Sequence, residues 1–213
     1  MEANERNWYA LKVFYNKVFE MEDLLGGRGI ECYLAVEKEL LKGEAHLAAA
    51  RKLAMTPEGG KPDGHFIREG ALIYRRRPLV NSLLFVCASP QEILWVDAVL
   101  NEPNERGSSR GFIYKRSISP DKQVFEVIPP RQMEIFRLVT GAGLGGLEFF
   151  ADDDITRYKR GGRVRVTEGP LKGAEGYIKR IRKDRRLLVA IEGVIAVATA
   201  YIPPQLLEPV PEE

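Results

Sequence analysis

Positively charged side chains are concentrated in one segment of the chain, from Arg157 to Arg186. This segment has twelve Lys and Arg residues against three acidic residues, whereas the net charge of all 213 residues is only +2. The rest of the chain is therefore acidic. Guanidinium and ammonium groups at this density bind the phosphates of nucleic acids or an acidic protein partner. The alternative is a solvated surface without a ligand, and charge alone does not decide between the two.

Five arginines outside this segment are also candidates for contacts with nucleic-acid phosphates. Three of them are consecutive and stand before a proline, in a sequence that otherwise indicates a charged turn. Arginine at such positions can contact the backbone of an exposed single strand. The five candidates are Arg75, Arg76, Arg77, Arg106 and Arg110.

The sequence contains no arrangement typical of catalysis or of metal binding. The glycine-rich segment 141–146 resembles a dinucleotide-binding loop, but such a loop follows a strand, and here a helix is predicted before it. His46 and His65 are the only histidines, too few for a zinc site. No serine or cysteine stands in a recognisable nucleophile motif. We therefore expect a protein that is not an enzyme and has no metal and no cofactor.

The segment 162–181 contains two β-branched strands around a turn rich in glycine and proline. Glycine adopts the positive φ angles that tight turns need, and Pro170 suits a bend because it cannot donate to a strand ladder. This spacing resembles the KOW motif of small SH3-like barrels in ribosomal proteins and NusG-type transcription factors. The residues of the motif are Gly162, Val164, Val166, Gly169, Pro170, Gly173, Gly176 and Ile178.

The residues before this motif predict a separate α+β domain over 1–145. Apolar periodicity gives the order strand, helix, strand, strand, helix, strand, helix, which is the split βαβ or ferredoxin-like pattern. A long insertion at about 37–74 interrupts it, and the composition of Glu37–Met55 favours a helix there. The expected elements are a strand at 8–14, a helix capped by Asn16, strands at 30–36, 66–74 and 79–88, a helix from Ser89, short strands at 111–116 and 124–128, and a helix from Pro130.

The domain ends in a connecting segment and then a barrel. Ser89, Pro90 and Glu92 form a capping box with proline at the first helical position, a strong helix start. Residues 146–160 combine glycines with acidic and basic residues, which indicates a linker. Residues 161–209 are expected to form the small all-β SH3-like (KOW) barrel.

Several fragments in the expected order resemble the NusG family of transcription elongation factors. Trp8–Leu11 resembles the aromatic first strand of the family, and Gly29–Leu34 resembles its second strand. Pro78-Leu79 followed by Leu84–Val86 resembles the third strand, and Val127–Pro129 resembles the entry to the last helix. With the KOW motif at the end, these fragments identify an N-terminal (NGN) domain and a C-terminal KOW domain.

The resemblance implies a partner and a function. In this family the N-terminal domain binds the clamp helices of the largest RNA polymerase subunit through an apolar cavity, and opposes pausing and termination. The five separate arginines named above would then contact the non-template DNA strand, and the KOW domain would recruit a ribosomal protein or a termination factor. By position, the residues implied for polymerase binding are Tyr9, Leu11, Leu83, Phe85 and Ile128, although strand alternation makes each equally a core residue.

Departures from the family pattern indicate a specialised paralogue of the RfaH or UpxY kind, which acts in antitermination on particular operons such as those for surface polysaccharides. Asn81-Ser82-Leu83 stands where the family has a tyrosine in the pocket, and the insertion is unusually long. The alternative function is a KOW-type RNA-binding protein of the ribosome or of RNA processing, which is motivated by the basic segment.

Composition places the chain among ordinary water-soluble globular proteins. The hydrophobic fraction is 45% and the charged fraction is 29%. No apolar run is long enough to span a membrane, and the start of the chain does not resemble a secretory signal. Cys32 and Cys87 lie in apolar strand-like runs, which favours reduced core thiols. We therefore expect a cytoplasmic protein without a membrane partner.

Overall fold

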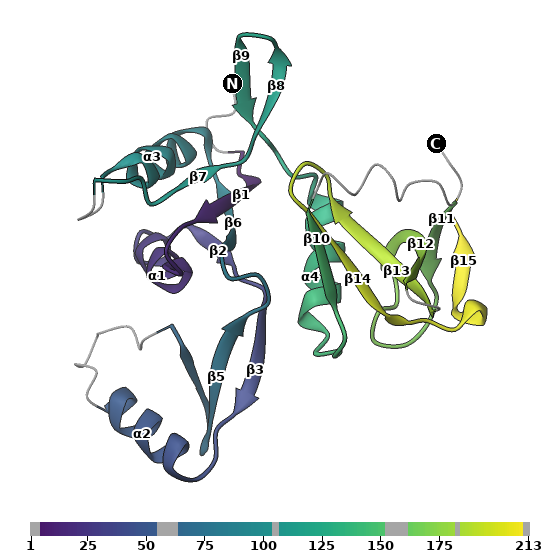
Figure 1. The fold of residues 1–213 in the computed structure, drawn as a ribbon, viewed down its shortest axis with the longest axis horizontal. Coiled ribbons are helices and arrows are strands. Elements are labelled where there is room, and N and C mark those ends of the chain that lie inside the picture. Colours follow the sequence, from purple (N-terminus) through teal and green to yellow (C-terminus); the bar gives the residue numbers. More distant parts are fainter. Residues whose placement is uncertain (1–4, 55–63, 104–106, 152–161, 182–183, 211–213) are drawn as a thin grey trace. The chain divides into compact units, whose positions relative to one another are not determined.

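The computed structural model describes residues 5–54, 64–103, 107–151, 162–181 and 184–210 (Figure 1). The chain divides into two compact units. The first contains Leu11–Ile113 together with the start of the chain, and the second contains Asn7–Ala10 together with Tyr114–Glu213. The described residues form four α-helices and several antiparallel sheets, so the protein is of the mixed α and β class.

The first unit contains most of a four-stranded sheet with the order β2-β6-β1-β7, in which Asn7–Ala10 of β1 belong to the second unit. Its strands are β1 (Asn7–Val13), β2 (Glu31–Tyr33), β6 (Leu83–Ala88) and β7 (Gly111–Ile113). Helix α1 (Val18–Gly27) connects β1 to β2, and α3 (Pro90–Asn101) connects β6 to β7. This order, in which β6 lies between β1 and β2, is the split βαβ arrangement expected from the sequence.

The start of α3 confirms the predicted capping box. Ser89 Oγ accepts a hydrogen bond from the backbone N–H of Glu92 at 3.3 Å, and the Glu92 carboxylate accepts one from the N–H of Ser89 at 2.8 Å. The hydrogen bond from the Ser89 backbone is the largest cause that lowers the pKa of Glu92. A cap of this kind stabilises a helix by about 1 kcal/mol.

The start of α1 differs from the prediction. Tyr15 and Asn16 have φ angles of 59° and 55°, and Asn16 does not cap the helix. The helix begins after Lys17 without a side-chain hydrogen bond to its first turn. The chain therefore reverses through two left-handed residues, an unusual conformation for tyrosine.

The insertion is a small layer of its own, with a second sheet of order β3-β5-β4. The prediction of one helix over Glu37–Met55 is wrong in its first part: β3 (Val36–Leu40) precedes α2 (Gly43–Ala54). Strands β4 (Phe66–Glu69) and β5 (Leu72–Pro78) follow. Strand β3 forms because it pairs with β5 along its whole length, and this pairing overrides helix propensity.

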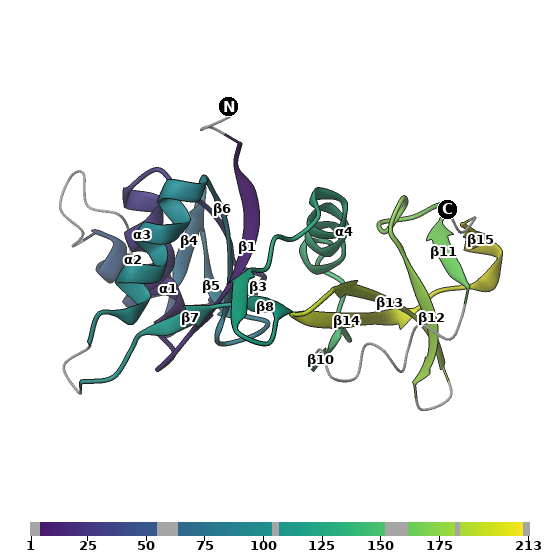
Figure 2. The ribbon, with the colours of Figure 1, turned by 90° about the horizontal axis from the view of Figure 1, so that it is seen from above.

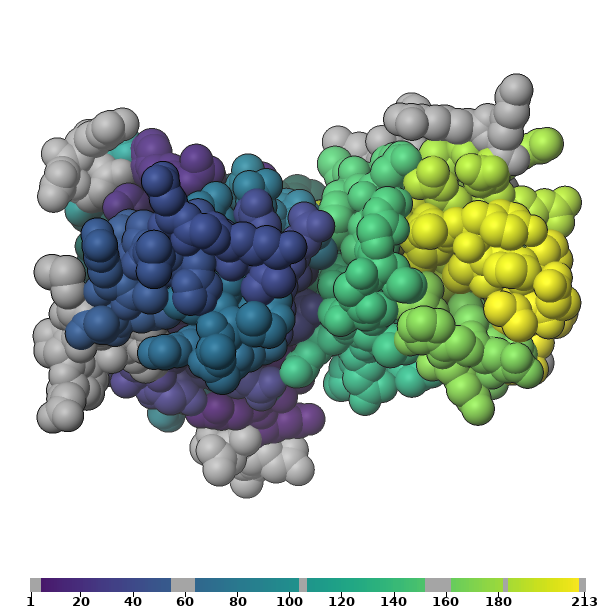
Figure 3. All heavy atoms as spheres, turned by 90° about the horizontal axis from the view of Figure 1, so that it is seen from below, coloured from purple at the N-terminus to yellow at the C-terminus, as the bar shows by residue number. Residues whose placement is uncertain are grey.

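Helix α2 and this sheet enclose a separate small core. Leu41, Ala49 and Ile73 are its buried residues, and Leu53 and Phe66 pack against them. Figure 3 shows the insertion, in dark and mid blue, as a continuous part of one surface of its unit. The insertion thus contributes packed structure to the unit.

The second unit contains a two-stranded hairpin, a helix and a six-stranded antiparallel sheet. The hairpin is β8 (Lys115–Ser119) with β9 (Lys122–Phe125), and α4 (Pro130–Gly141) starts at the predicted proline. Helix α4 lies beside β13 in both ribbon views (Figures 1 and 2). The sheet has the order β10-β14-β13-β12-β11-β15, with strands β10 (Glu148–Ala151), β11 (Arg163–Val166), β12 (Glu175–Ile181), β13 (Asp184–Ile191), β14 (Ile195–Tyr201) and β15 (Leu207–Pro209), and a short 3-10 turn at Pro204–Leu206.

The predicted linker 146–160 is partly structured. Glu148–Ala151 is strand β10, which pairs with β14, and residues 152–160 lie outside the described part of the chain. Phe150 on β10 packs against the buried Leu188, Ala196 and Ala198. The apolar pair Phe149-Phe150 explains the strand, because it extends the sheet core beyond the segment that carries the KOW motif.

Candidate partner-binding and nucleic-acid-binding sites

The residues predicted to bind polymerase do not form one surface. Val13 donates its backbone N–H to the carbonyl of Ser82 at 2.8 Å, which sets β1 against β6. Val13 and Ser82 are therefore opposite each other and lie on the same face of the sheet, and Leu11 lies on that face too because side chains alternate along a strand. Leu83 and Phe85 are one and three residues after Ser82, so they lie on the opposite face. A Cβ on Gly111, which pairs with Val13, would meet Leu100 of α3 at 3.2 Å. The Leu11 face is therefore the one that the helices cover.

The opposite face carries an aromatic residue that the sequence analysis did not select. Tyr33 pairs with Phe85 across β2 and β6, and their ring centroids are 6.4 Å apart. Tyr33 is half-buried, whereas Leu83 and Phe85 are 5% and 1% exposed. Tyr33 is therefore the most accessible of the three side chains.

Tyr9 and Ile128 belong to the second unit and are both buried. Ile128 donates its backbone N–H to Trp8 at 2.8 Å, and the ring of Tyr9 meets Phe125 edge-on at 6.5 Å. Both residues hold the root of the β8–β9 hairpin and the start of α4. In this structure they act as core residues, and their role in polymerase binding stays a prediction.

The three consecutive arginines point to two different sides of β5. Arg76 makes a bidentate ion pair with Glu22 of α1, with both distances 2.8 Å, and donates to the carbonyl of Gly64. Arg75 and Arg77 lie on the other side and share Glu39 of β3, at 3.8 and 2.9 Å. Arg76 thus joins the insertion to α1, and only Arg75 and Arg77 present exposed cations.

The two remaining candidates are not next to these arginines in the sequence. Arg110 is 3.6 Å from Glu102, and both side chains are exposed. Arg106 lies outside the described residues. A common nucleic-acid surface for these five arginines stays a prediction.

The KOW-like motif forms β11, a tight turn and β12. Gly162 precedes β11, Val164 and Val166 lie on it, and Ile178 lies on β12. Gly169 and Gly173 have φ angles of 81° and 86° in the turn that contains Pro170, and Gly173 donates to Val166 at 2.8 Å. A Cβ on Gly176 would stand 2.2 Å from the carbonyl oxygen of Leu188, so glycine is required there by the neighbouring strand.

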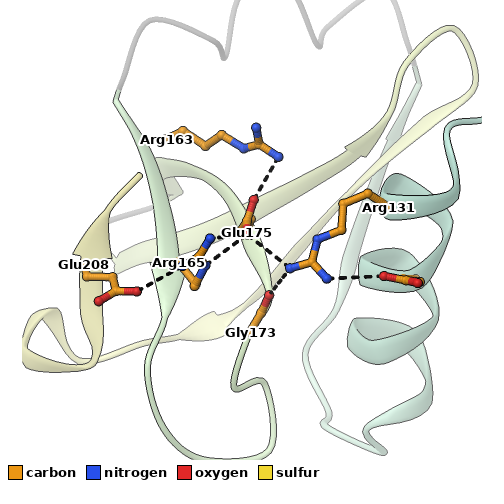
Figure 4. Close-up of polar contacts among 7 residues, drawn as sticks. Arg131, Arg163, Arg165, Gly173, Glu175 and Glu208 are labelled. Carbon is orange, nitrogen blue, oxygen red and sulfur yellow. Dashed lines mark hydrogen bonds and ion pairs between the residues drawn. The ribbon is translucent and has the colours of Figure 1, made fainter. Parts of the chain in front are cut away.

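Three arginines converge on one carboxylate at the end of this motif (Figure 4). Glu175, at the start of β12, has only 7% of its side chain exposed. It accepts from Arg165 Nε at 3.0 Å and from Arg131 Nη2 at 3.1 Å, and Arg163 Nη2 is 2.9 Å from its other oxygen. Arg131 comes from α4 and also donates to the carbonyl of Gly173 at 3.1 Å. We call Arg131, Arg163 and Arg165 with Glu175 the arginine cluster.

Electrostatics keep Glu175 ionised in this cluster. Burial by itself raises the pKa of its carboxyl, but hydrogen bonds from Arg131 and Arg165 and the charge of Arg163 outweigh burial, so the pKa is lowered. The bond to Glu175 in turn raises the pKa of Arg131. The outer donors of Arg131 and Arg165 reach the exposed carboxylates of Glu134, at 3.2 Å, and Glu208, at 3.5 Å.

Neither a metal centre nor a membrane-spanning helix is found in the described parts of the chain. No group of three or more His, Cys, Asp or Glu side chains there is placed to hold a metal ion. None of the described helices is both long enough and apolar enough to cross a bilayer.

Comparison with known proteins yields likeness at the level of whole structures. No family model matches the chain, and no curated protein matches it. A solved structure that describes domain interaction in Thermotoga maritima NusG aligns with 98% of this chain and 99% of that chain, at 16% identity and a TM-score of 0.38. At this TM-score the likeness carries no functional conclusion.

Proposed function

We propose that this protein is a NusG-like regulator of transcription elongation that binds RNA polymerase through its first unit. The observation that supports the proposal is the strand order β2-β6-β1-β7 with capped α3, followed along the chain by a sheet that carries the KOW-like turn. These elements appear in the order that the sequence fragments require.

The surface proposed to bind the polymerase is the sheet face of Tyr33, Leu83 and Phe85. An apolar face with an aromatic residue at its edge holds the apolar side of a partner helix, and aromatic residues supply much of the affinity in such interfaces. Tyr33 is half-buried and is the accessible aromatic residue of the three. The expected partner is the pair of clamp helices of the largest polymerase subunit.

We further propose antitermination on selected operons, in the manner of specialised paralogues. The insertion supports this proposal, because it adds a packed layer to the unit beyond the four-stranded sheet. This layer presents the exposed side chains of Arg75 and Arg77. The second unit would recruit a ribosomal protein or a termination factor.

Affinity purification of the tagged chain from its native cell tests the function. Recovery of the polymerase subunits at near-equal amounts, resistant to nuclease treatment, is the expected result. Recovery of ribosomal particles without polymerase would instead favour an RNA-binding protein of the ribosome, the alternative that the basic segment supports.

A further inference from the structure

We propose that the arginine cluster of the second unit binds the phosphate backbone of single-stranded nucleic acid. This inference rests on the second unit alone, so it holds whether or not the first unit binds RNA polymerase. No residue of the cluster belongs to the surfaces discussed above for polymerase or for non-template DNA.

The geometry of the cluster is that of a prearranged anion site. Arg165 of β11 pairs in register with Glu175 of β12, and Arg163 of β11 pairs with Tyr177 of β12. The side chains of these two pairs therefore lie on one face of the two strands. Arg131 reaches the same carboxylate from α4. Glu175 is almost completely buried, whereas 45% to 52% of each arginine side chain is exposed. The buried carboxylate thus fixes three guanidinium groups that remain open to solvent.

The outer partners of these arginines are weak and replaceable. Glu134 and Glu208 are 67% and 50% exposed, and ion pairs between exposed groups contribute little because water and salt screen them. Each guanidinium has five N–H donors, and a phosphate can accept two of them from one arginine. A phosphate can therefore replace Glu134 or Glu208 while Glu175 stays in place.

The neighbouring side chain favours a nucleic acid as the ligand. Tyr177 is half-buried beside Arg163 on the same face, and an aromatic ring next to cations is the arrangement on which single-stranded bases stack. The surrounding segment, Arg157 to Arg186, has twelve basic and three acidic residues, which adds long-range attraction for a polyanion.

The direct test compares two double variants of the full chain that lose equal charge. Arg163→Gln with Arg165→Gln removes two members of the cluster. Arg180→Gln with Arg185→Gln removes an exposed cross-strand pair from the same sheet, which lies outside the cluster. Binding of labelled single-stranded RNA and of DNA of the same sequence is measured by fluorescence anisotropy over a series of salt concentrations.

The cluster variant is expected to bind both strands at least about 10-fold more weakly. The slope of log K against log salt should fall by about 1.4, since each lost phosphate contact contributes about 0.7 for single strands. The control should change affinity by less than about 3-fold. Equal weakening by the two variants, or no binding by the wild type at about 50 mM salt, would overturn the proposal.

Two further variants separate a prearranged site from simple positive charge. Glu175→Gln removes one negative charge and so makes the net charge more positive by one. We nevertheless expect weaker binding, because the guanidinium groups lose the carboxylate that holds them together. Tighter binding would overturn the inference. Glu134→Gln with Glu208→Gln should bind more tightly, since two exposed competitors are removed. That second variant changes only exposed side chains, so it keeps the test valid if Glu175→Gln fails to fold.

Discussion

At the scale of single residues, Glu175 and Gly176 show why the KOW-like turn has its sequence. Glu175 is held by arginines from α4 and β11, and Gly176 lies against the carbonyl of Leu188 on β13. One residue therefore fixes the charges of this region, and the next allows two strands to approach closely.

We expect Gly176→Ala to destabilise the second unit by about 2 kcal/mol or more, because the added Cβ would stand 2.2 Å from a backbone oxygen. Gly162→Ala is the matched control, since a Cβ there has no atom within 4 Å and its φ is not positive. Urea unfolding followed by circular dichroism measures both. Equal stability of the two variants would contradict the close approach.

The lowered pKa of Glu175 predicts a pH-dependent contribution to stability. Because the folded-state value lies below the ordinary value of 4.5, the contribution is complete above about pH 4.5 and is lost as pH falls through the folded-state value. The difference in unfolding free energy between wild type and Glu175→Gln should be about 2 kcal/mol at pH 7 and should shrink at about pH 3. The same difference at both pH values would exclude the ionised cluster.

At the scale of elements, what the sequence predicts depends on how local the signal is. The start of α3 is predictable because Ser89 and Glu92 are three residues apart and complete the cap by themselves. Strand β3 is not predictable in this way, because its partner β5 lies more than thirty residues later and Glu and Lys favour a helix when read alone.

Contacts between residues far apart in the chain bring together the parts of the candidate sites that the sequence does not predict. The KOW-like turn is visible in the sequence, but Arg131 is 44 residues from Glu175 and only the fold brings them together. The alternation of Ile30 to Val36 does not predict Tyr33, because it does not show which face of the strand meets Phe85. The register between β2 and β6 supplies that information.

Arg76 connects the insertion to α1, so it should matter more for stability than its neighbours. We expect Arg76→Ala to lower the free energy of unfolding by about 1.5–3 kcal/mol, because a bidentate pair with Glu22 and a bond to Gly64 are lost. Arg77→Ala, which removes an exposed pair with Glu39, should cost less than about 1 kcal/mol. A double-mutant cycle with Glu22→Gln isolates the coupling, and a coupling near zero would contradict the role of Arg76.

At the scale of the whole molecule, each of the two units has its own proposed binding surface. The first unit presents the sheet face of Tyr33 and the exposed arginines of the insertion, and the second presents the arginine cluster. Helix α4 packs against β13 within the second unit, and the expected N-terminal domain over 1–145 stays a prediction. A fragment that starts at residue 161 would lack Arg131 and strand β10.

The central claim is that the Tyr33 face binds RNA polymerase, and a binding titration of the purified full chain with core polymerase tests it most directly. Tyr33→Ala should weaken binding by at least about 10-fold, the loss expected when a large aromatic anchor of an interface is truncated. Tyr201→Ala, which removes an equally large exposed side chain from the second unit, should leave the affinity unchanged. Wild-type affinity for the Tyr33 variant, with the fold intact by circular dichroism, would contradict the account.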